Sequence, residues 1–334
     1  MNGGDSKDDE EEREQVMSEV HLGCPPGISG PHISRFTICL PSGVESSRFN
    51  GLFKEEESCT DQEISFDEDG DLILPRRRQI SRRCFTMKIQ HNITSPIPNV
   101  GLQVWKAELI LSDFVLHKMC TSMEFHGIVS LELGAGTGLA GMLLAHAAKT
   151  VFLTDHGDQI LENCLKNVQL NSGVLNHQKV VYVRELDWTH PWPPKVSSDL
   201  ATQERFSWSS SELEEVQKAS LLLAADVIYS DDLTDALFGI LERIMSQGSE
   251  KVLYLALEKR YNFSLDDLDV VANGYLNFRS YLKDDSECEG LELGSLPCFM
   301  GKCIDVAEIP QYVGGYDRGD DVELWEIRYS KGKL

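Results

Sequence analysis

The chain has 334 residues, 41% of them hydrophobic, and a formal net charge of -23. So acidic a surface repels phosphate backbones, which argues against direct binding of nucleic acid and favours a basic, lysine-rich protein as partner. The sequence contains no apolar run of about eighteen residues, and its charged first residues lack the apolar core of a signal peptide, so we expect neither a membrane span nor secretion.

Residues 1–95 differ in composition from the rest of the chain. The acidic block DSKDDEEEREQ cannot form a core, and the segments after it scatter short apolar islands among turn formers. We expect this region to be a largely disordered extension with one short strand near Phe36–Leu40. Five arginines (Arg76, Arg77, Arg78, Arg82 and Arg83) form either a nuclear-import signal or a solvated tail.

The nine cysteines are scattered along the chain, and no C-x-x-C motif occurs. Disulfide frameworks and zinc sites both require closer spacing than this. We therefore expect reduced thiols and no bound metal.

From about residue 100 onward, apolar strands alternate with helical patterns. We predict strands at 128–133, 150–155, 179–186, within 220–229 and at 251–258, and helices after Gly138, ending near Lys149, and over 160–171, 231–245 and 265–278. Two late segments, 302–309 and 321–330, alternate apolar and polar residues as an antiparallel pair at a sheet edge would. This order predicts an α/β, doubly wound, Rossmann-like domain over residues 96–334, with its ligand at the carboxyl ends of the strands. We place the insertion at 189–219 over that same edge.

The stretch VSLELGAGTGLAG at 129–141 puts a glycine-rich turn directly after the first of these strands. Gly136, Gly138 and Gly141 satisfy the G-x-G-x-x-G spacing of a dinucleotide site. Glu132, Gly134, Gly136 and Gly138 equally satisfy the E-x-G-x-G-x-G spacing of an S-adenosylmethionine site. Neither match decides the nucleotide by itself.

Residues outside the turn separate the two nucleotides. An anion at Glu132 gains nothing beside a pyrophosphate, whereas S-adenosylmethionine has no phosphate and carries a sulfonium and an ammonium group. Asp155, at the end of the next strand, can accept hydrogen bonds from ribose hydroxyls in either kind of site. In ELDW (185–188), Asp187 can take the adenine amino hydrogen and Trp188 can lie against the ring face, unless Trp188 is an ordinary anchor of the insertion. The chain after residue 280 is too short for the second domain of a dehydrogenase, so we predict S-adenosylmethionine.

Five motifs occur in an order that resembles a known family. GLQVW (101–105), ELGAGTG (132–138), TD (154–155), ELDW (185–188) and ADVIY (225–229) are similar to motifs of the seven-strand protein-lysine methyltransferases of the methyltransferase-like 21 and 22 type, over about residues 98–330. The resemblance implies a seven-stranded class I methyltransferase fold, S-adenosylmethionine as cofactor, and transfer of a methyl group to a protein lysine. It also implies a nuclear enzyme whose substrate is the Kin DNA- and RNA-binding protein.

The resemblance further implies roles for single residues. Asp226 would orient the substrate, Tyr229 would form a wall of the amine channel, and Trp105 would cover the methionine end of the cofactor. The other cofactor-binding residues are expected in the glycine turn and at the strand ends (Glu132, Gly134, Ala135, Gly136, Asp155, Asp187, Trp188 and Ala225).

The chemistry of methyl transfer to an amine explains such a site. The lysine, whose free pKa is about 10.4, must arrive neutral, and an apolar channel lowers that pKa by desolvation. Asp226 and Tyr229 can then orient the amine lone pair. The alternative for Asp226 is a cap on the helix at 231–245, and the alternative for Trp105 is core packing. Arg260 and Phe263 lie past the fifth strand, at the expected substrate edge.

Two other functions stay open at this point. The chain could be a cofactor-binding scaffold without catalysis, although the intact Asp226–Tyr229 pair argues against it, or a methyltransferase of small molecules. For the enzyme we expect a monomer in the nucleus, with the cytoplasm as a second location.

Overall fold

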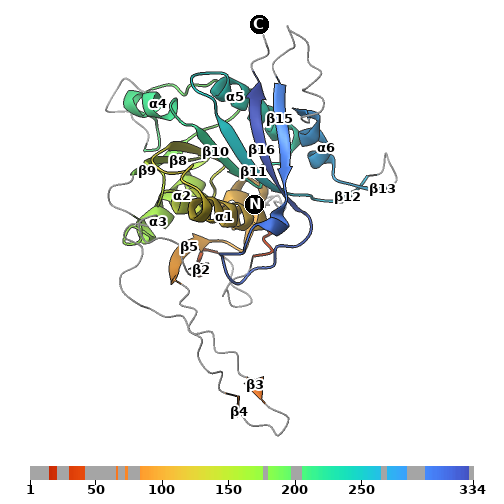
Figure 1. The fold of residues 1–334 in the computed structure, drawn as a ribbon. Coiled ribbons are helices and arrows are strands. Elements are labelled where there is room, and N and C mark those ends of the chain that lie inside the picture. The colour runs from red at the N-terminus through yellow and green to blue at the C-terminus, as the bar shows by residue number, and fades with distance from the viewer. Residues whose placement is uncertain are drawn as a thin grey trace, which may run out of the picture.

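In a computed structural model, the protein is described at residues 15–20, 30–41, 65–66, 72–73, 83–175, 180–196, 205–264, 269–283 and 298–330. An eight-stranded sheet with the order β14-β15-β16-β11-β10-β7-β8-β9 forms the centre of the fold (Figure 1). Its strands are β7 (Val129–Leu133), β8 (Thr150–Asp155), β9 (Val180–Glu185), β10 (Leu221–Ala225), β11 (Val252–Glu258), β14 (Leu282–Lys283), β15 (Cys298–Ile304) and β16 (Val322–Ser330). The helices are α1 (Lys106–Thr121), α2 (Leu139–Leu144), α3 (Asp158–Leu170), α4 (Ser210–Val216), α5 (Asp231–Met245) and α6 (Asn273–Ser280).

Only β16 runs against the direction of the other strands in this sheet. The strands from β9 to β11 pair in parallel, β16 pairs antiparallel with both β11 and β15, and the short β14 adds to β15 in parallel. The predicted Rossmann-like fold and the late antiparallel pair are thus confirmed. The strand order reverses between β7 and β10, so the carboxyl ends of these two strands flank the crevice where such sheets bind ligands.

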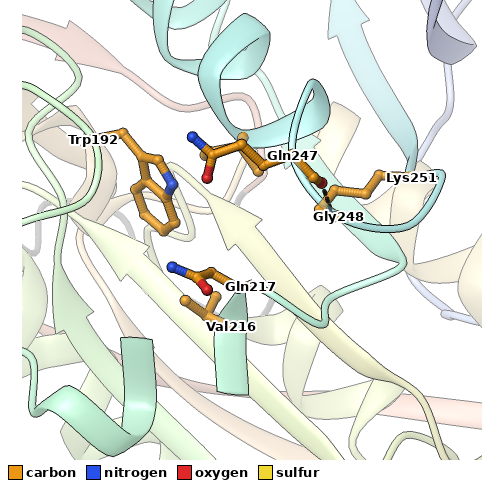
Figure 2. A pocket seen from close by; sticks show the side chains of 7 residues that line it. Trp192, Val216, Gln217, Gln247, Gly248 and Lys251 are labelled. Atoms are coloured by element: carbon orange, nitrogen blue, oxygen red, sulfur yellow. Dashed lines mark hydrogen bonds between the residues drawn. The ribbon is translucent and has the colours of Figure 1, made fainter. Parts of the chain in front are cut away.

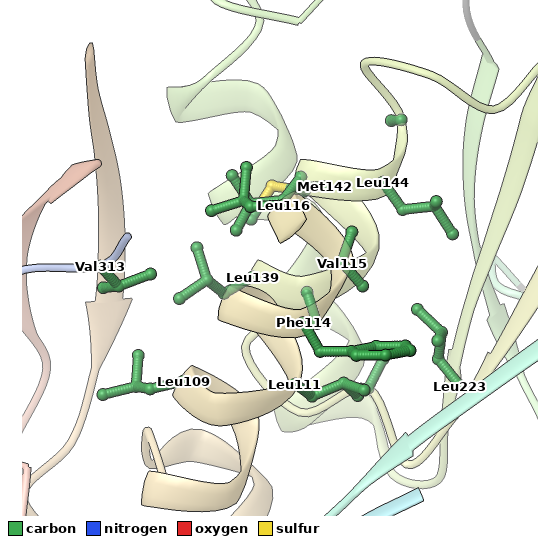
Figure 3. Close-up of a cluster of buried hydrophobic side chains, with 14 of the residues drawn as sticks. Leu109, Leu111, Phe114, Val115, Leu116, Leu139, Met142, Leu144, Leu223 and Val313 are labelled. Carbon is green, nitrogen blue, oxygen red and sulfur yellow. The ribbon is translucent and has the colours of Figure 1, made fainter. Parts of the chain in front are cut away.

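Two apolar clusters, one on each face of the sheet, hold the layers together. Leu109, Phe114 and Leu116 of α1 are at most 2% exposed and pack with α2 and with Leu223 of β10 (Figure 3). Helices α4, α5 and α6 pack on the other cluster. Because α1 buries residues on nearly every side, it is a core helix rather than a surface one.

Two predicted helices end or begin elsewhere. Helix α2 ends at Leu144, and the chain then turns so that it can enter β8, which excludes Lys149 from the last helical turn. The helix predicted over 265–278 is wrong at residues 269–271, because β13 (Asp269–Val271) pairs with β12 (Asn262–Ser264) and α6 begins only at Asn273, while 265–268 lie outside the described residues. The β-branched pair Val270–Val271 favours a strand.

The predicted boundary at residue 95 needs correction, because two strands before it belong to the core of the domain. Strand β2 (His32–Leu40), longer than the predicted one, pairs antiparallel with β5 (Arg83–His91). Their inward side chains lie in the same apolar cluster as α1 (Phe36, Ile38, Leu40, Phe85, Met87 and Ile89). The acidic block and Arg76 to Arg82 lie outside the described residues, and so do the predictions made for them.

Short elements complete the part of the chain before α1. Strand β1 (Gln15–Met17) pairs with β6 (Thr94–Pro96), β3 (Ser65–Phe66) pairs with β4 (Leu72–Ile73), and the 3-10 helix η2 (Ile97–Leu102) leads toward α1. Cys39 and Cys84, opposite each other in β2 and β5, form a disulfide, so the prediction of reduced thiols is wrong for this pair.

Side chains of α3 cover the outer edge of β5. Three asparagines at four-residue intervals face that strand (Asn163, Asn167 and Asn171). The Lys88 and Gln90 amides donate to Asn171 Oδ1 and Asn167 Oδ1 at 2.9 and 2.7 Å. The side-chain amides donate in return to the Lys88 and Gln90 carbonyls. The strand is therefore bonded to a helix on this side.

The outer edge of β2 is covered by the segment between β15 and β16, which also contains the 3-10 helix η3 (Val306–Glu308). The Cys39 amide donates to the Tyr312 carbonyl at 3.0 Å, and the Gly314 amide donates to the Thr37 carbonyl at 2.9 Å. Val313 lies between these bonds, paired with Ile38. The C-terminal part of the chain thus holds the hairpin against the domain.

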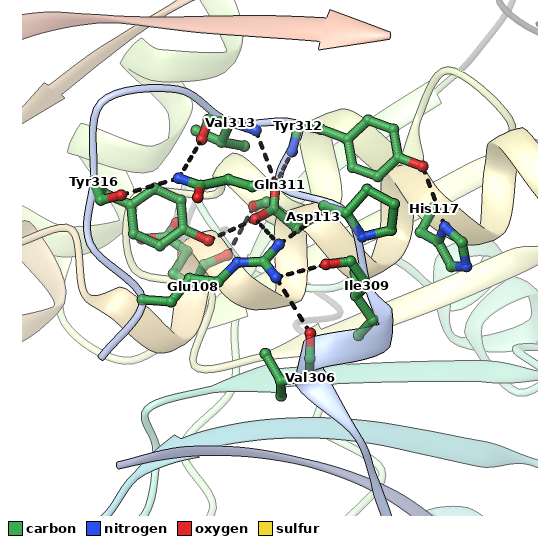
Figure 4. Close-up of polar contacts among 12 residues, drawn as sticks. Glu108, Asp113, His117, Val306, Ile309, Gln311, Tyr312, Val313 and Tyr316 are labelled. Atoms are coloured by element: carbon green, nitrogen blue, oxygen red, sulfur yellow. Dashed lines mark hydrogen bonds and ion pairs between the residues drawn. The ribbon is translucent and has the colours of Figure 1, made fainter. Parts of the chain in front are cut away.

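Asp113 of α1 anchors that segment (Figure 4). Its Oδ1 accepts hydrogen bonds from the Tyr312 and Val313 amides at 2.8 Å, and its Oδ2 accepts from the Tyr316 hydroxyl at 2.6 Å and from Arg318 at 2.7 Å. Arg318 also donates to backbone carbonyls of the same segment. Asp113 is 0% exposed, and burial raises its pKa against the opposing effect of Tyr316, the Val313 amide and Arg318.

Among the described residues, no helix is both long enough and apolar enough to span a membrane.

Candidate active site

The turn between β7 and α2 packs tightly against its neighbours. Gly134 and Gly136 have φ angles of 64° and 51°, a region that favours glycine. A Cβ atom at Gly134 would lie 2.6 Å from Val227 Cγ1, and one at Gly136 would lie 3.0 Å from the Gly101 carbonyl oxygen. The turn, with Ala135 between the two glycines, therefore presents bare backbone at the carboxyl edge of the sheet.

Two buried carboxyl groups lie beneath this turn. Glu108 of α1 accepts from the Thr137 hydroxyl at 2.6 Å and from the Leu139 amide at 3.1 Å, so it caps the start of α2. Burial raises its pKa to about 7. Glu132 is 2% exposed and lies against Gly141 of α2, and burial followed by the charge of Glu108 raises its pKa well above the usual range. Glu132 thus faces α2, and its contact with a cofactor stays a prediction.

Asp155 ends β8 beside the same turn. Its Oδ2 accepts from the Gly136 amide and its Oδ1 from the His156 amide, both at 2.8 Å. Burial raises the pKa of Asp155, and the two amide bonds oppose this. These bonds fix the carboxylate while leaving a lone pair on each oxygen. A bond to ribose hydroxyls fits this geometry and stays a prediction.

Asp187 bonds to its own loop after β9. Its Oδ1 accepts from the amide and the hydroxyl of Thr189 at 2.9 and 2.7 Å, and its Oδ2 lies 2.8 Å from His190 Nδ1. Although burial raises the pKa of Asp187, the bonds from Thr189 and His190 leave it below the usual value. Asp187 thus stabilises its own loop, but Oδ2 accepts only one of these bonds and keeps a lone pair, so its contact with an adenine amino group stays a prediction.

Trp188 lies beside the glycine turn. Its ring carbons Cζ2 and Cη2 would be 3.4 Å from a Cβ atom at Gly134. The ring is half-buried, and its buried Nε1 makes no hydrogen bond to any described residue. A mere anchor would be expected to satisfy its N–H group. The unbonded N–H fits a ligand site, and the contact of the indole with a cofactor stays a prediction.

Asp226 follows β10 at the same edge of the sheet. Among the described residues it is the one non-glycine residue with positive φ, 54°, and such strained positions concentrate at functional sites. Its Oδ2 forms an ion pair with Arg260 Nη2, whereas its buried Oδ1 has no hydrogen-bond partner in the described chain. Burial raises the pKa of Asp226 and Arg260 opposes this. Ser230 is the N-cap of α5, so the capping alternative for Asp226 is wrong.

Trp105 contacts the Arg260 side chain that pairs with Asp226, and Ala225 directly precedes Asp226. Trp105 is the N-cap residue of α1, and its Nε1 donates to the Val100 carbonyl at 3.1 Å. The Cζ atom of Arg260 lies 4.6 Å from the centroid of its ring, a cation–π contact. Ala225 is the half-buried last residue of β10. Trp105 therefore borders the Asp226–Arg260 pair, and its place over the methionine end of a cofactor stays a prediction.

A small pocket adjoins the ion pair. It is lined by Ile228, Tyr229, Leu257, Glu258, Arg260, Gly274 and Tyr275. Tyr229 is 42% exposed, and desolvation followed by the charges of Asp155 and Asp226 raises its pKa. Tyr229 and Arg260 therefore line one opening, and the ion pair joins Arg260 to the buried Asp226 behind it.

Sequence reasoning missed several residues of this site. Glu108 is an isolated acid in the otherwise apolar helix KAELILSDFVL, and that isolation was the available signal. Asp113, a second acid of that helix, was also missed, but it anchors residues 312–318 rather than the site. Glu258 and Tyr275 gave no signal of their own, and Tyr275 lines the pocket from a separate element, α6. The side chain of Phe263 lies outside what the structure describes.

The polar atoms left unbonded at this edge fit the predicted cofactor. Trp188 Nε1 and Asp226 Oδ1 are buried and have no partner among the described residues, whereas Glu132 Oε2, also without a partner there, faces Gly141 of α2. An aromatic donor beside the glycine turn suits a ligand that carries an aromatic base, and a carboxyl oxygen directly after β10 suits an amine or a positively charged group. Within the same residues, no group of three or more potential ligands could hold a metal ion.

A second pocket lies at the opposite edge of the sheet (Figure 2). It is lined by Trp192, Val216, Gln217, Ile244, Gln247, Gly248 and Lys251. Lys251 directly precedes β11, so this pocket faces the amino ends of the strands. The insertion at 189–219 therefore does not lie wholly over the ligand edge, because Trp192 packs at the other end.

Comparisons with known proteins show the family of this chain. The Lysine methyltransferase family model matches residues 86–202 and 195–273. Methyltransferase-like protein 22 from Homo sapiens is 38% identical over 246 residues, which cover 72% of this chain and 57% of that protein. The protein of the same name from Mus musculus is 39% identical over 341 residues, which cover 91% of this chain and 80% of that protein. Protein N-lysine methyltransferase METTL21A from Mus musculus is 33% identical over 162 residues, which cover 48% of this chain and 62% of that protein.

Among solved structures, magnesium protoporphyrin IX methyltransferase from Synechocystis with bound SAH has a TM-score of 0.37 and 10% identity, over 67% of this chain and 84% of that one. The family match and the relatives confirm the predicted resemblance to the methyltransferase-like 21 and 22 type. The same family match and relatives also support S-adenosylmethionine, and not NAD, as the cofactor.

Proposed function

This chain belongs to the lysine methyltransferase family, and from that premise we propose that it methylates a lysine of a basic, nucleic-acid-associated nuclear protein. The first candidate substrate is the Kin DNA- and RNA-binding protein, suggested by the resemblance to methyltransferase-like protein 22. The net charge of -23 supports a basic partner. The arginine cluster at 76–83 supports entry into the nucleus.

The free Oδ1 atom of Asp226 is the observation that carries the reaction. It is a buried acceptor without a partner in the described chain, and Arg260, which forms an ion pair with the other oxygen of the same carboxylate, lines a small pocket together with Tyr229. A lysine side chain that enters past Tyr229 can donate an N–H hydrogen to this oxygen. The amine lone pair is then free to point toward the cofactor.

The chain contributes positioning and desolvation. When bound, S-adenosylmethionine supplies a methyl group that is already activated for displacement. Ile228, Leu257 and Tyr275 surround the amine with apolar surface, which favours its neutral form. Asp226 orients the lone pair, and the residues of the glycine turn hold the donor side of the reaction in place.

We expect Trp188→Ala to weaken binding of S-adenosylmethionine at least tenfold. Stacking of a base on an aromatic ring contributes about 1 to 3 kcal/mol, and tenfold corresponds to about 1.4 kcal/mol. Titration calorimetry measures the change, and NAD should show no tight binding. Trp188→Phe keeps an aromatic face and should retain most of the affinity. Equal affinity of the alanine variant, with its fold intact by thermal unfolding, would show that the indole is only an anchor.

The proposed reaction can be tested by adding the enzyme and methyl-labelled S-adenosylmethionine to a nuclear extract. We expect label in protein, on lysine after hydrolysis, and label in purified Kin under the same conditions. Label in small molecules alone would favour a small-molecule methyltransferase. Cofactor binding without any transfer would favour an inactive scaffold.

The acidity of the chain predicts a salt-dependent reaction. Attraction between an acidic enzyme and a basic substrate is screened by ions, with a Debye length of about 8 Å at physiological ionic strength. The rate at subsaturating protein substrate should therefore fall between low and physiological salt, while the rate at saturation changes little. A rate that does not respond to salt would leave the charge of -23 without a role in recognition.

A further inference from the structure

Arg260 is the one basic side chain placed on the Asp226 carboxylate in the described structure. Its Nη2 forms an ion pair with Oδ2, and the side chain of Asp226 is 2% exposed against 35% for Arg260. The two carboxylate oxygens are therefore not equivalent. Oδ2 is occupied by a guanidinium, and Oδ1 is buried without a partner among the described residues.

The guanidinium is held in place from a second direction. Its Cζ lies 4.6 Å from the centroid of the Trp105 ring, so the planar group rests on an aromatic face while it pairs with Asp226. Arg260 also lines the pocket that we assign to the incoming lysine. A fixed positive charge thus stands at the wall of the amine site.

We propose that Arg260 is a positioning residue for methyl transfer: it occupies Oδ2 of Asp226 and balances the charge of that carboxylate, so that Oδ1 receives the substrate amine in its neutral form. This inference rests on the lysine methyltransferase function proposed above. Arg260 would act through Asp226 rather than on the reacting atoms.

An isolated carboxylate would work against the reaction. A negative charge within about 4 to 6 Å favours the ammonium form of lysine and raises its pKa by roughly 1 to 3. The ammonium form has no lone pair and cannot attack. A nearby guanidinium lowers the pKa of the amine. The Asp226–Arg260 pair therefore offers a hydrogen-bond acceptor but raises the pKa of the amine less than an unpaired carboxylate would.

The other groups around the pair do not supply this balance. The titratable side chains that face it from neighbouring elements are mostly acids and phenols (Glu108, Asp155, Tyr229, Glu258 and Tyr275). Lys106 pairs with Glu258 at 2.8 Å, and its Nζ is also bonded to Glu19. Its charge is therefore already matched by acids. Removing Arg260 should leave Asp226 surrounded by negative charge.

Titration of Asp226 tests the inference without any assay of activity. Asp226 can be followed by carboxyl carbon NMR, with its signal assigned by comparison with Asp226→Asn. In Arg260→Met its pKa should rise above that of the unmodified protein, because burial already raises it and the opposing guanidinium is gone. Arg260→Lys keeps a charge and should give an intermediate value. Arg243→Met, the same change at an exposed residue at the far end of α5, should have no effect.

The second measurement is the pH dependence of turnover on the labelled protein substrate. Arg260→Met should move the acid limb of the kcat profile about one pH unit toward alkaline pH, so that kcat at neutral pH falls about tenfold and recovers at higher pH. KM for the protein should not rise. A merely structural role would lower kcat at every pH and leave the profile in place.

The outcomes separate the two proposals. An unchanged Asp226 titration or an unmoved pH profile in Arg260→Met overturns the role of Arg260, even if lysine methylation is confirmed. Absence of methylation by the unmodified enzyme, with the Asp226 titration shifted as expected, overturns the proposed function instead.

Discussion

Asp226→Asn should lower turnover by about two orders of magnitude or more while the fold and the affinity for S-adenosylmethionine are kept. Asparagine has one acceptor oxygen where aspartate has two. If that oxygen faces Arg260, the amide NH₂ faces the substrate amine and donates where an acceptor is required. If the amide is turned around, two donors meet at Arg260. In the first orientation the substrate amine has no acceptor, and in the second the ion pair with Arg260 is replaced by contact between two donors.

The backbone of Asp226 makes asparagine the right substitution. Asparagine tolerates the left-handed region in which this residue stands, at φ 54°. Asp226→Ala would add backbone strain of about 1 kcal/mol or more and confuse loss of function with loss of stability. Asp232→Asn, the same chemical change in the first turn of α5, serves as the matched control and should stay active. Thermal unfolding with and without cofactor, beside the methylation assay, gives the answer. A stable, cofactor-binding and fully active Asp226→Asn protein would refute the proposed site.

Asp113→Ala should lower the free energy of unfolding by about 3 to 5 kcal/mol. The substitution removes the acceptor of four donors at once, namely two backbone amides, the Tyr316 hydroxyl and Arg318. Each buried donor left unsatisfied costs about 1 to 3 kcal/mol. Asp113→Asn keeps one acceptor oxygen and should lose roughly half as much. Denaturant unfolding measures both, as a lower midpoint at an unchanged slope.

A double-mutant cycle with Arg318 distinguishes the network from the effect of a cavity. Arg318→Met leaves Asp113 with three donors and should cost less than Asp113→Ala. Because the aspartate is the shared acceptor, adding Arg318→Met to Asp113→Ala should cost little more. Strictly additive losses would mean that Asp113 and Arg318 stabilise the segment independently.

The local features of the fold were predictable because their signals are local. The strands of the sheet are short apolar runs, and the glycine turn follows one of them directly. The pattern of apolar residues therefore predicts the strands, and the glycines predict the turn. The acidic start of α5 at Asp231 and Asp232 marks its first turn. Asp226 could be singled out because it follows β10, at an edge that the strand pattern already identified as the ligand edge.

Features that depend on distant pairing were not predictable in this way. The strands β2 and β5 pair across a sequence separation of 45 at Cys39 and Cys84, and the sequence of neither strand identifies the other as its partner. The alternation of Phe85, Met87 and Ile89 was a usable signal, but the charged surroundings masked it. Arg260 could be placed near the substrate edge. Its contact with both Asp226 and Trp105 required the packing of three separate elements.

The asparagines of α3 have a consequence for contacts between molecules. A two-stranded sheet ordinarily has two rows of unpaired peptide groups, to which a strand of another chain can add, and this is a route to aggregation. A primary amide carries a donor and an acceptor side by side, as a peptide group does. The peptide groups on the outer edge of β5 are therefore bonded by side-chain amides, as they would be by a neighbouring strand (Asn163, Asn167 and Asn171). On the outer edge of β2 they are bonded by the backbone of residues 312–314. At Lys88 and Gln90 of β5, and at Thr37 and Cys39 of β2, the outward peptide groups are therefore already bonded and cannot pair with a strand of another chain.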